Sequence, residues 1–235
     1  MEPIMNDNDN LNSKIYKENI NDNVNMIPGD PYGSPDESFK TLVFLDAGFL
    51  SKLSNYFGKG NYISYNIIKF AENLSKKQNL ICEHIFYYTA PPFQSEKPII
   101  EESNKYRKYE KFIKKISENK IISIREGRCQ RLKINNKFIY KQKGVDTLMT
   151  IDLMSCPLKY PKIKKIILIA SDSDFVPAVE SLKEFGVMII LYTYYEKERT
   201  TNFSTSNELI KSVYKYVLLT KEDFYNAPLN KISGE

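Results

Sequence analysis

Short apolar runs recur along most of the chain at lengths that are typical of β-strands. Strands are predicted over residues 41–45, 81–88, 121–124, 166–170, 187–192 and 216–219. These runs are almost continuously apolar and do not alternate with polar residues, which is the pattern of strands that are buried on both faces of a parallel sheet. The sequence therefore predicts a central sheet that is covered on both sides.

Segments with helical spacing of apolar residues separate these runs. Helices are predicted over residues 64–77, 99–118, 145–154, 175–185, 206–213 and 221–225. The third of these is expected to stop before Pro157, and Gly186 is expected to close the fourth. Alternating strands and helices imply right-handed crossovers, so we expect an α/β fold, a three-layer α/β/α sandwich with a mainly parallel central sheet.

Two further segments depart from this alternation. Residues 128–140 alternate around Asn135 and Asn136, which tolerate positive φ, and they predict a small basic β-hairpin inserted into the fold. Residues 1–38 are rich in Asn, Asp, Ser and Pro and show no sustained period, which predicts a disordered or loosely docked tail. We therefore expect one folded domain over residues 39–228, followed by a flexible C-terminus at 229–235.

Charge is distributed unevenly along the chain. The whole sequence has a formal net charge of +5, yet residues 1–38 hold eight acidic residues and two lysines. Residues 97–143 hold fifteen Lys and Arg and five Glu. Such a basic block is expected of a protein that binds a phosphate backbone. A solvated helix and hairpin in a lysine-rich protein would show the same charge, so charge alone leaves both interpretations open.

Cysteine and histidine content excludes several kinds of site. Cys82, Cys129 and Cys156 are widely separated and odd in number, which argues against a disulfide framework and predicts a reducing, cytoplasmic location. The only histidine, His84, lies inside an apolar run, so catalytic triads and zinc sites are poorly supported. No apolar stretch approaches the roughly 20 residues of a membrane span. Chemistry is then expected from carboxylates, hydroxyls, lysines or a hard metal ion.

Four aspartates stand where a parallel sheet forms its active site. Asp46 directly follows the first predicted strand, Asp172 and Asp174 follow the strand at 166–170, and Asp146 begins a helix. Sites of this fold class form beyond the carboxyl ends of the strands, where strand order reverses. If the two strands are neighbours there, the acids converge and a cation must offset their repulsion. All-oxygen ligands favour Mg²⁺ or Mn²⁺.

Structural roles compete with this interpretation for most of the acids. Asp172 or Asp174 could cap the following helix, and Asp146 could be a first-turn acid that the helix dipole favours. Asp46 is harder to explain structurally, and we interpret it as functional. Asp152 lies six residues beyond Asp146 and points about 240° around the helix from it, so the two are not expected to share one metal ion.

Four motifs stand in order around these acids: residues 43–50 (Val-Phe-Leu-Asp-Ala-Gly-Phe-Leu), 87–92 (Tyr-Tyr-Thr-Ala-Pro-Pro), 143–146 (Lys-Gly-Val-Asp) and 171–177 (Ser-Asp-Ser-Asp-Phe-Val-Pro). In their order and spacing they resemble the motifs of the NYN domain, a branch of the PIN-like nuclease superfamily. The resemblance covers about residues 40–225 and implies an α/β/α sandwich with an acidic, divalent-metal pocket.

Site residues follow from the resemblance position by position. Asp46, Asp146 and Asp172 would be the principal metal-site acids, and Asp174 a fourth or water-mediated ligand. Many relatives carry Asn shortly after the first Asp, whereas this chain has Gly48 and Phe49 there. That departure leaves the first acid intact but removes the expectation of a polar substrate contact at this point.

The expected function is metal-dependent endoribonuclease activity on RNA phosphodiester bonds, since several members of the resembled family are ribonucleases. Lys143 would neutralise a phosphate oxygen or would be a solvated helix-flanking lysine. Ser171 and Ser173 would donate to phosphate or cap a helix, with capping favoured for Ser173. Backbone contacts and base stacking on single-stranded or structured RNA are expected from Tyr106, Arg107, Lys108, Lys111, Arg125, Arg128, Arg131 and Lys133.

Two other classes of protein are alternatives to the nuclease. A catalytically inactive RNA-binding or scaffold module of the same fold would keep the basic block and lose turnover. A phosphatase of the haloacid dehalogenase type would need Asp-x-Asp after the first strand, and Gly48 stands at the second position. The phosphatase is therefore disfavoured. Oligomeric state is left open, with a homo-oligomer as one alternative.

Overall fold

The computed structural model of the chain describes residues 39–196, 203 and 207–229. The predicted N-terminal tail at 1–38 and the last six residues of the predicted C-terminal tail lie outside the described residues. None of the described helices is both long and apolar enough to span a membrane.

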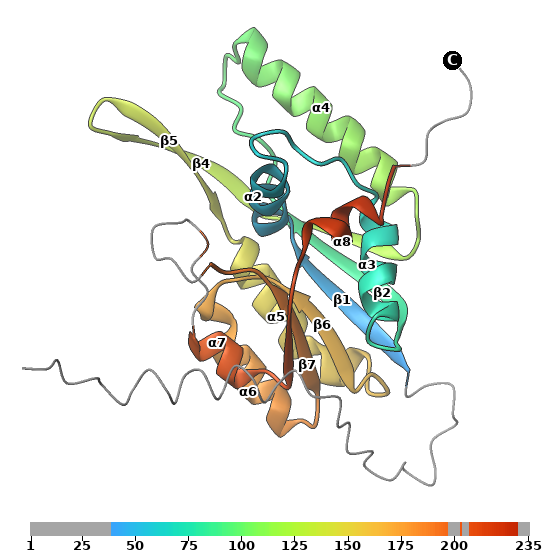
Figure 1. The fold of residues 1–235 in the computed structure, drawn as a ribbon. Helices are drawn as coiled ribbons and strands as arrows, with labels where there is room; N and C mark the ends of the chain where they lie inside the picture. The colour runs from blue at the N-terminus through green and yellow to red at the C-terminus, as the bar shows by residue number, and fades with distance from the viewer. Residues whose placement is uncertain (1–38, 197–202, 204–206, 230–235) are drawn as a thin grey trace, which may run out of the picture. The chain divides into compact units, whose positions relative to one another are not determined.

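Within the described residues, six parallel strands form one sheet in the order β3-β2-β1-β6-β7-β8. The strands are β1 (Lys40–Asp46), β2 (Ile81–Thr89), β3 (Ile122–Glu126), β6 (Lys165–Ile169), β7 (Met188–Thr193) and β8 (Lys215–Leu218). β1 and β6 are neighbours at the centre of the sheet (Figure 1), and Leu45 of β1 pairs with Ile169 of β6. Strand order reverses between them, which confirms the predicted parallel sheet and its switch point.

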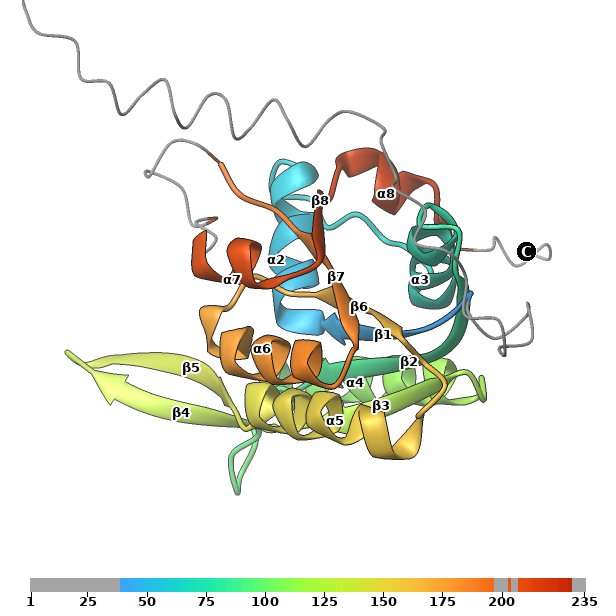
Figure 2. The same ribbon diagram turned by 90° about the horizontal axis from the view of Figure 1, so that it is seen from below.

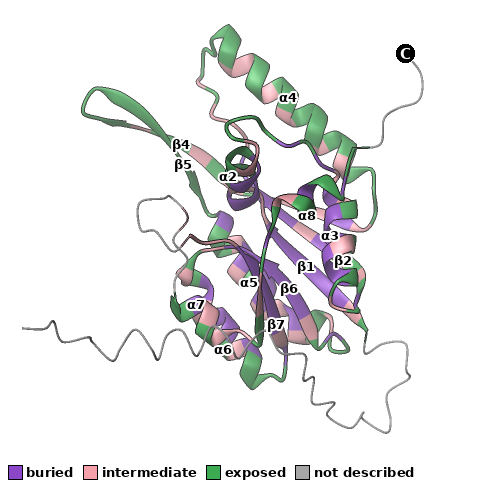
Figure 3. Cartoon of the chain, viewed as in Figure 1, coloured by how far each residue is buried: buried purple, intermediate pink, exposed green. Residues whose placement is uncertain are grey.

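Helices cover both faces of this sheet, which confirms the α/β/α sandwich (Figure 2). On one face lie α2 (Ala47–Phe57), α3 (Ile67–Lys76) and α8 (Lys221–Tyr225); on the other lie α5 (Val145–Lys159), α6 (Val176–Glu184) and α7 (Asn207–Ser212), with a short 3₁₀ turn η1 (Ser173–Phe175) before α6. Helix α4 (Ile100–Ser117) packs against the first face through Ile113 and Ile116. Its remaining surface is largely exposed (Figure 3).

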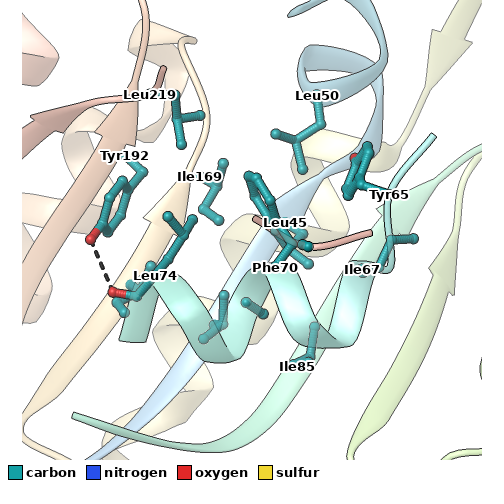
Figure 4. Packing of buried hydrophobic residues seen from close by; sticks show 14 of the residues in the cluster. Leu45, Leu50, Tyr65, Ile67, Phe70, Leu74, Ile85, Ile169, Tyr192 and Leu219 are labelled. Atoms are coloured by element: carbon teal, nitrogen blue, oxygen red, sulfur yellow. Dashed lines mark hydrogen bonds between the residues drawn. The ribbon is translucent and has the colours of Figure 1, made fainter. Parts of the chain in front are cut away.

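Alternate residues of β1 build two separate cores. Val43 and Leu45 face α2 and α3, while Leu42 and Phe44 face α5 and α6. Figure 4 shows the first core, where the side chains of α3 meet those of the sheet and the Tyr192 hydroxyl donates to the carbonyl oxygen of Leu74 at 3.0 Å. Because both faces of the central strands are buried, their sequences are continuously apolar, as the strand prediction assumed.

The helices of the structure differ from the predicted ones at three places. Helix α2 was not predicted, because its Gly, Ser and Asn content hides the buried positions Phe49, Leu50 and Leu53. Helix α3 begins at residue 67 because Asn66 caps it. The side-chain oxygen of Asn66 accepts hydrogen bonds from the backbone N–H groups of Ile68 and Lys69. The prediction that a helix stops before Pro157 is wrong, since α5 continues to Lys159.

The predicted hairpin is present as β4 (Arg128–Ile134) and β5 (Lys137–Lys143), paired antiparallel in a separate two-stranded sheet. Its turn residues, Asn135 and Asn136, have φ of 49° and 60°, as the turn prediction required. The hairpin projects from the body as an arm (Figures 1 and 2), and every residue of β5 is exposed (Figure 3). Its base nevertheless joins directly to α5, next to the predicted acids.

Candidate functional site

A cavity of about 950 Å³ opens at the switch point of the sheet, and three of the predicted acids line it. Asp46 ends β1, Asp146 lies in the first turn of α5, and Asp172 follows β6. The three side chains come from segments far apart in the sequence. They are brought together because the carboxyl ends of β1 and β6 lie side by side and α5 begins at the same edge.

Asp46 caps the N-terminus of α2. Its Oδ1 atom accepts from the backbone N–H of Gly48 at 2.8 Å and of Phe49 at 3.1 Å, so it is the N-cap of that helix. Asp46 therefore has a structural role that the sequence did not indicate, and its functional role stays a prediction. Its other oxygen, Oδ2, has no hydrogen-bond partner among residues 39–196, 203 and 207–229, which leaves one atom free for a ligand.

Burial and charge make the Asp46 carboxylate costly to ionise. Burial raises its pKa, the negative charge of Asp146 raises it further, and the two backbone hydrogen bonds and the charge of Lys52 lower it; the net pKa is raised. The pKa of Asp146 is raised as well, first by burial and then by the charges of Asp172 and Asp174. The acids thus repel one another across the cavity.

Asp172 also has a capping role. It accepts from the backbone N–H of Asp174 at 3.0 Å and is the N-cap of η1. The residue that caps η1 is therefore Asp172, and our prediction that Ser173 is the cap is wrong. Of the two serines, Ser171 lines the cavity and Ser173 does not. Asp174 does not line the cavity either, and it acts on Asp146 through its charge alone.

The carboxylate oxygens of Asp46, Asp146 and Asp172 are of the chemical type that binds a hard cation. Carboxylates that repel one another lose that repulsion when a cation lies between them, and oxygen ligands are those that Mg²⁺ and Mn²⁺ prefer. In the part of the chain that the structure describes, however, no group of three or more His, Cys, Asp or Glu side chains is arranged to hold a metal ion. The acids are therefore coupled by charge, without a formed ligand set.

Lys52 is a cation of the cavity that sequence reasoning missed. It lies on α2, lines the cavity, and its positive charge lowers the pKa of both Asp46 and Asp146. It was missed because α2 itself was not predicted. The predicted Lys143 is exposed at the end of β5 and does not line the cavity. Its neighbours on the same strand, Tyr140, Lys141 and Gln142, do line it.

Aromatic rings form the wall of the cavity beside the acids, and none of them was predicted as a site residue. Besides Phe49 and Phe203, the rings that line the cavity are Tyr62, Tyr65, Tyr87, Tyr109, Phe112 and Tyr140. We call these last six rings the aromatic wall. The chain contains 17 tyrosines, so no single one stands out in the sequence. Only their meeting from separate elements marks them as a group.

The eight residues of the basic block that were predicted to contact RNA lie outside the cavity lining. Arg107, Lys108 and Lys111 are exposed on α4, and Arg128 and Lys133 are exposed on the hairpin. Tyr106 is half-buried on α4. These exposed cations of α4 and the hairpin, which we call the basic surface, thus lie outside the cavity, although other residues of α4 and of β5 line it.

Two of the predicted RNA-binding arginines already have partners within the fold. Arg125 donates through Nε to Asp152 Oδ2 at 2.7 Å, and Asp152 lies away from the cavity, as its position along α5 predicted. The Arg131 guanidinium lies 4.5 Å from the centroid of Phe93 and 4.6 Å from that of Phe138. Both arginines contribute to packing, and they are weaker candidates for RNA contacts than the exposed cations.

Comparison with known proteins agrees with this architecture. No curated protein matches the chain significantly. A crystal structure of a protein of unknown function from Vibrio parahaemolyticus is similar in fold, with a TM-score of 0.51 and 16% sequence identity, over 82% of this chain and 99% of that one. The family model of the NYN domain matches residues 40–220. The chain therefore belongs to the NYN domain family and has its PIN-like, nuclease-type fold.

Proposed function

We propose that this protein is a metal-dependent endoribonuclease that hydrolyses RNA phosphodiester bonds in the cavity at the switch point. One observation carries the proposal. Three acidic side chains, Asp46, Asp146 and Asp172, line one cavity although they come from three separate segments, and burial and mutual repulsion raise the pKa of the first two. Acids held together against their own repulsion are typical of a site that binds a cation or a proton.

Mg²⁺ or Mn²⁺, held by Asp46, Asp146 and Asp172 with Asp174 nearby, would supply an activated water and stabilise charge on the phosphate. The chain itself would position the RNA. Lys52 lines the cavity and its positive charge acts on both Asp46 and Asp146, so its ammonium group suits a non-bridging phosphate oxygen. Ser171 would donate a hydrogen bond to the same phosphate, and Lys143 would hold the strand at the cavity edge.

The test is cleavage of end-labelled RNA by the purified chain, with Mg²⁺, with Mn²⁺ and with a chelator. Asp146→Asn is expected to lower kcat/KM by about 100-fold, which corresponds to about 2.7 kcal/mol of lost transition-state stabilisation. Equal cleavage by the wild type and the variant would contradict the proposal, because contaminating ribonucleases give that result.

Asp46→Asn is a sharper variant of the same test. Asn caps helices about as well as Asp, so α2 keeps its N-cap while the cavity loses a charge. We expect an unchanged melting temperature within a few degrees and a loss of cleavage similar to that of Asp146→Asn. Asp152→Asn is the matched control, because Asp152 is a buried aspartate outside the cavity lining. It should lower stability and leave cleavage intact.

An RNA-binding module without turnover is the second candidate. It is favoured by the absence, in residues 39–196, 203 and 207–229, of three acids arranged as a metal site, and by the capping roles of Asp46 and Asp172. This candidate predicts RNA binding that survives chelation and no metal-dependent cleavage by the wild type. The same cleavage assay, run beside a binding assay, separates the two.

A further inference from the structure

We propose that the aromatic wall is a stacking subsite for an unpaired RNA base, so that the protein selects single-stranded or looped-out nucleotides over duplex RNA. This inference rests on the proposed function, since it names the substrate class of the same cavity.

Three rings of the aromatic wall are accessible from the cavity. Tyr62 is 50% exposed, Phe112 37% and Tyr140 52%. They come from the segment between α2 and α3, from α4 and from β5, respectively. Exposed aromatic rings that gather from three elements around one hollow are the platforms on which bases stack in single-strand binders.

Each accessible ring is backed by another ring that holds its orientation. Tyr62 stacks on the buried Tyr65, with centroids 6.4 Å apart and an interplanar angle of 28°. Phe112 meets the buried Tyr87 edge to face at 6.0 Å. The ring centroids of Tyr140 and Phe93 lie 5.7 Å apart. Rings that are already ordered lose little side-chain entropy when a base stacks on them, which favours binding.

The aromatic wall adjoins the acids. Burial raises the pKa of Tyr87, and the neighbouring Tyr62 and the negative charge of Asp46 raise it further, so the Asp46 carboxylate acts electrostatically on this ring. RNA phosphates are repelled by the same carboxylate. Uncharged rings therefore supply the attraction that can hold a nucleotide close to the acids without adding charge, while the cations of the basic surface bind phosphates farther along the strand.

Stacking of this kind distinguishes unpaired from paired bases. Inside a duplex both faces of a base are covered by its neighbours, so no protein ring can reach them, whereas bases of single strands and loops can be splayed out onto aromatic side chains. The cavity volume of about 950 Å³ is also within the range of sites for small ligands, about 300–1,000 Å³. A substrate with free base faces fits these features.

The test measures the affinity of the full chain for a fluorescent single-stranded RNA and for a duplex hairpin of the same length, in the presence of a chelator so that no cleavage occurs. Tyr62→Ala and Tyr140→Ala are each expected to weaken single-strand binding about tenfold, equal to about 1.4 kcal/mol, and to leave duplex binding within twofold. Tyr140→Phe keeps the ring and should bind single strands like the wild type.

Tyr214→Ala is the matched control, because Tyr214 is similarly exposed, at 62%, and lies outside this cavity. It should leave both affinities unchanged. Unchanged single-strand affinity in both alanine variants would overturn the inference, and so would an equal loss for single strand and duplex. A melting curve of each variant checks that it folds. If the wild type cleaves RNA while these variants keep their affinity, only the subsite fails; if the wild type neither binds nor cleaves RNA, the proposed function fails.

Discussion

The side chain of Gln142, near the end of the hairpin strand β5, lies directly against Gly48 in the first turn of α2. A Cβ atom at position 48 would lie 3.2 Å from Gln142 Oε1 and 3.2 Å from Asp46 Oδ1. Asp46 Oδ1 cannot move away easily, because it accepts two backbone hydrogen bonds. The base of the hairpin and the first acid of the cavity therefore meet at Gly48, where a Cβ atom would crowd both side chains.

Gly48→Ala should show an energetic coupling to Gln142. Replacing Gly by Ala within a helix favours folding by up to about 1 kcal/mol, and crowding of the Gln142 amide offsets this gain. We expect the gain in the free energy of unfolding to be larger by at least about 0.5 kcal/mol in a Gln142→Ala background. Denaturant unfolding of both single variants and the double variant measures the coupling. Additive effects would show that the two residues do not contact each other in solution.

Asp146→Asn should change how stability depends on pH. The pKa of Asp146 is raised in the folded chain, so the contribution of this carboxyl group to stability is fully present below the ordinary aspartate pKa of about 3.9 and is lost as pH rises through the folded pKa. With a chelator present, the variant should melt at a higher temperature than the wild type near neutral pH. The difference should shrink below about pH 4.

Glu180→Gln, an exposed acid on α6, is the control for that comparison and should show no such trend. A variant at Asp146 that is no more stable than the wild type at neutral pH would mean that the acids do not repel each other as their placement indicates.

Arg125→Ala should affect stability more than RNA binding. Asp152 is buried, and its partners are Arg125 and the Tyr88 hydroxyl, which donates to Oδ2 at 3.0 Å. Removing the guanidinium leaves a buried carboxylate with one donor, so the free energy of unfolding should fall by about 1–3 kcal/mol. Arg107→Ala, on the exposed surface of α4, should give the reverse pattern. RNA affinity that falls equally in both variants would assign Arg125 to the RNA surface after all.

Exposed lysines of the hairpin should set the salt dependence of RNA binding. Lys133→Ala and Lys137→Ala should each weaken binding to all RNA sequences alike and reduce the slope of log K against log salt by about 0.7. The measurement is affinity across a series of salt concentrations. Lys183→Ala, on α6 at another surface, should leave the slope unchanged. An unchanged slope in the hairpin variants would mean that the arm does not contact phosphate.

Elements with a strong local signal were predicted correctly, and those that depend on distant contacts were not. The β1 segment is apolar along its length, and Asn135 with Asn136 suits a turn with positive φ, so both could be identified from neighbouring residues alone. Helix α2 has a weak local signal and forms because Asp46 caps it and the first core takes up Leu50 and Leu53. Its omission also hid Lys52.

For the site, the sequence by itself determined which acids stand at strand ends, because strand polarity places every carboxyl end at one edge of a parallel sheet. Its motifs also determined which family the chain resembles. Tertiary structure alone decided that Asp46 and Asp172 also cap helical turns, that Arg125 is held by Asp152, and that the aromatic wall lines the same cavity as the acids. These facts depend on distances between residues remote in sequence, and hydrophobic periodicity carries no information about such distances.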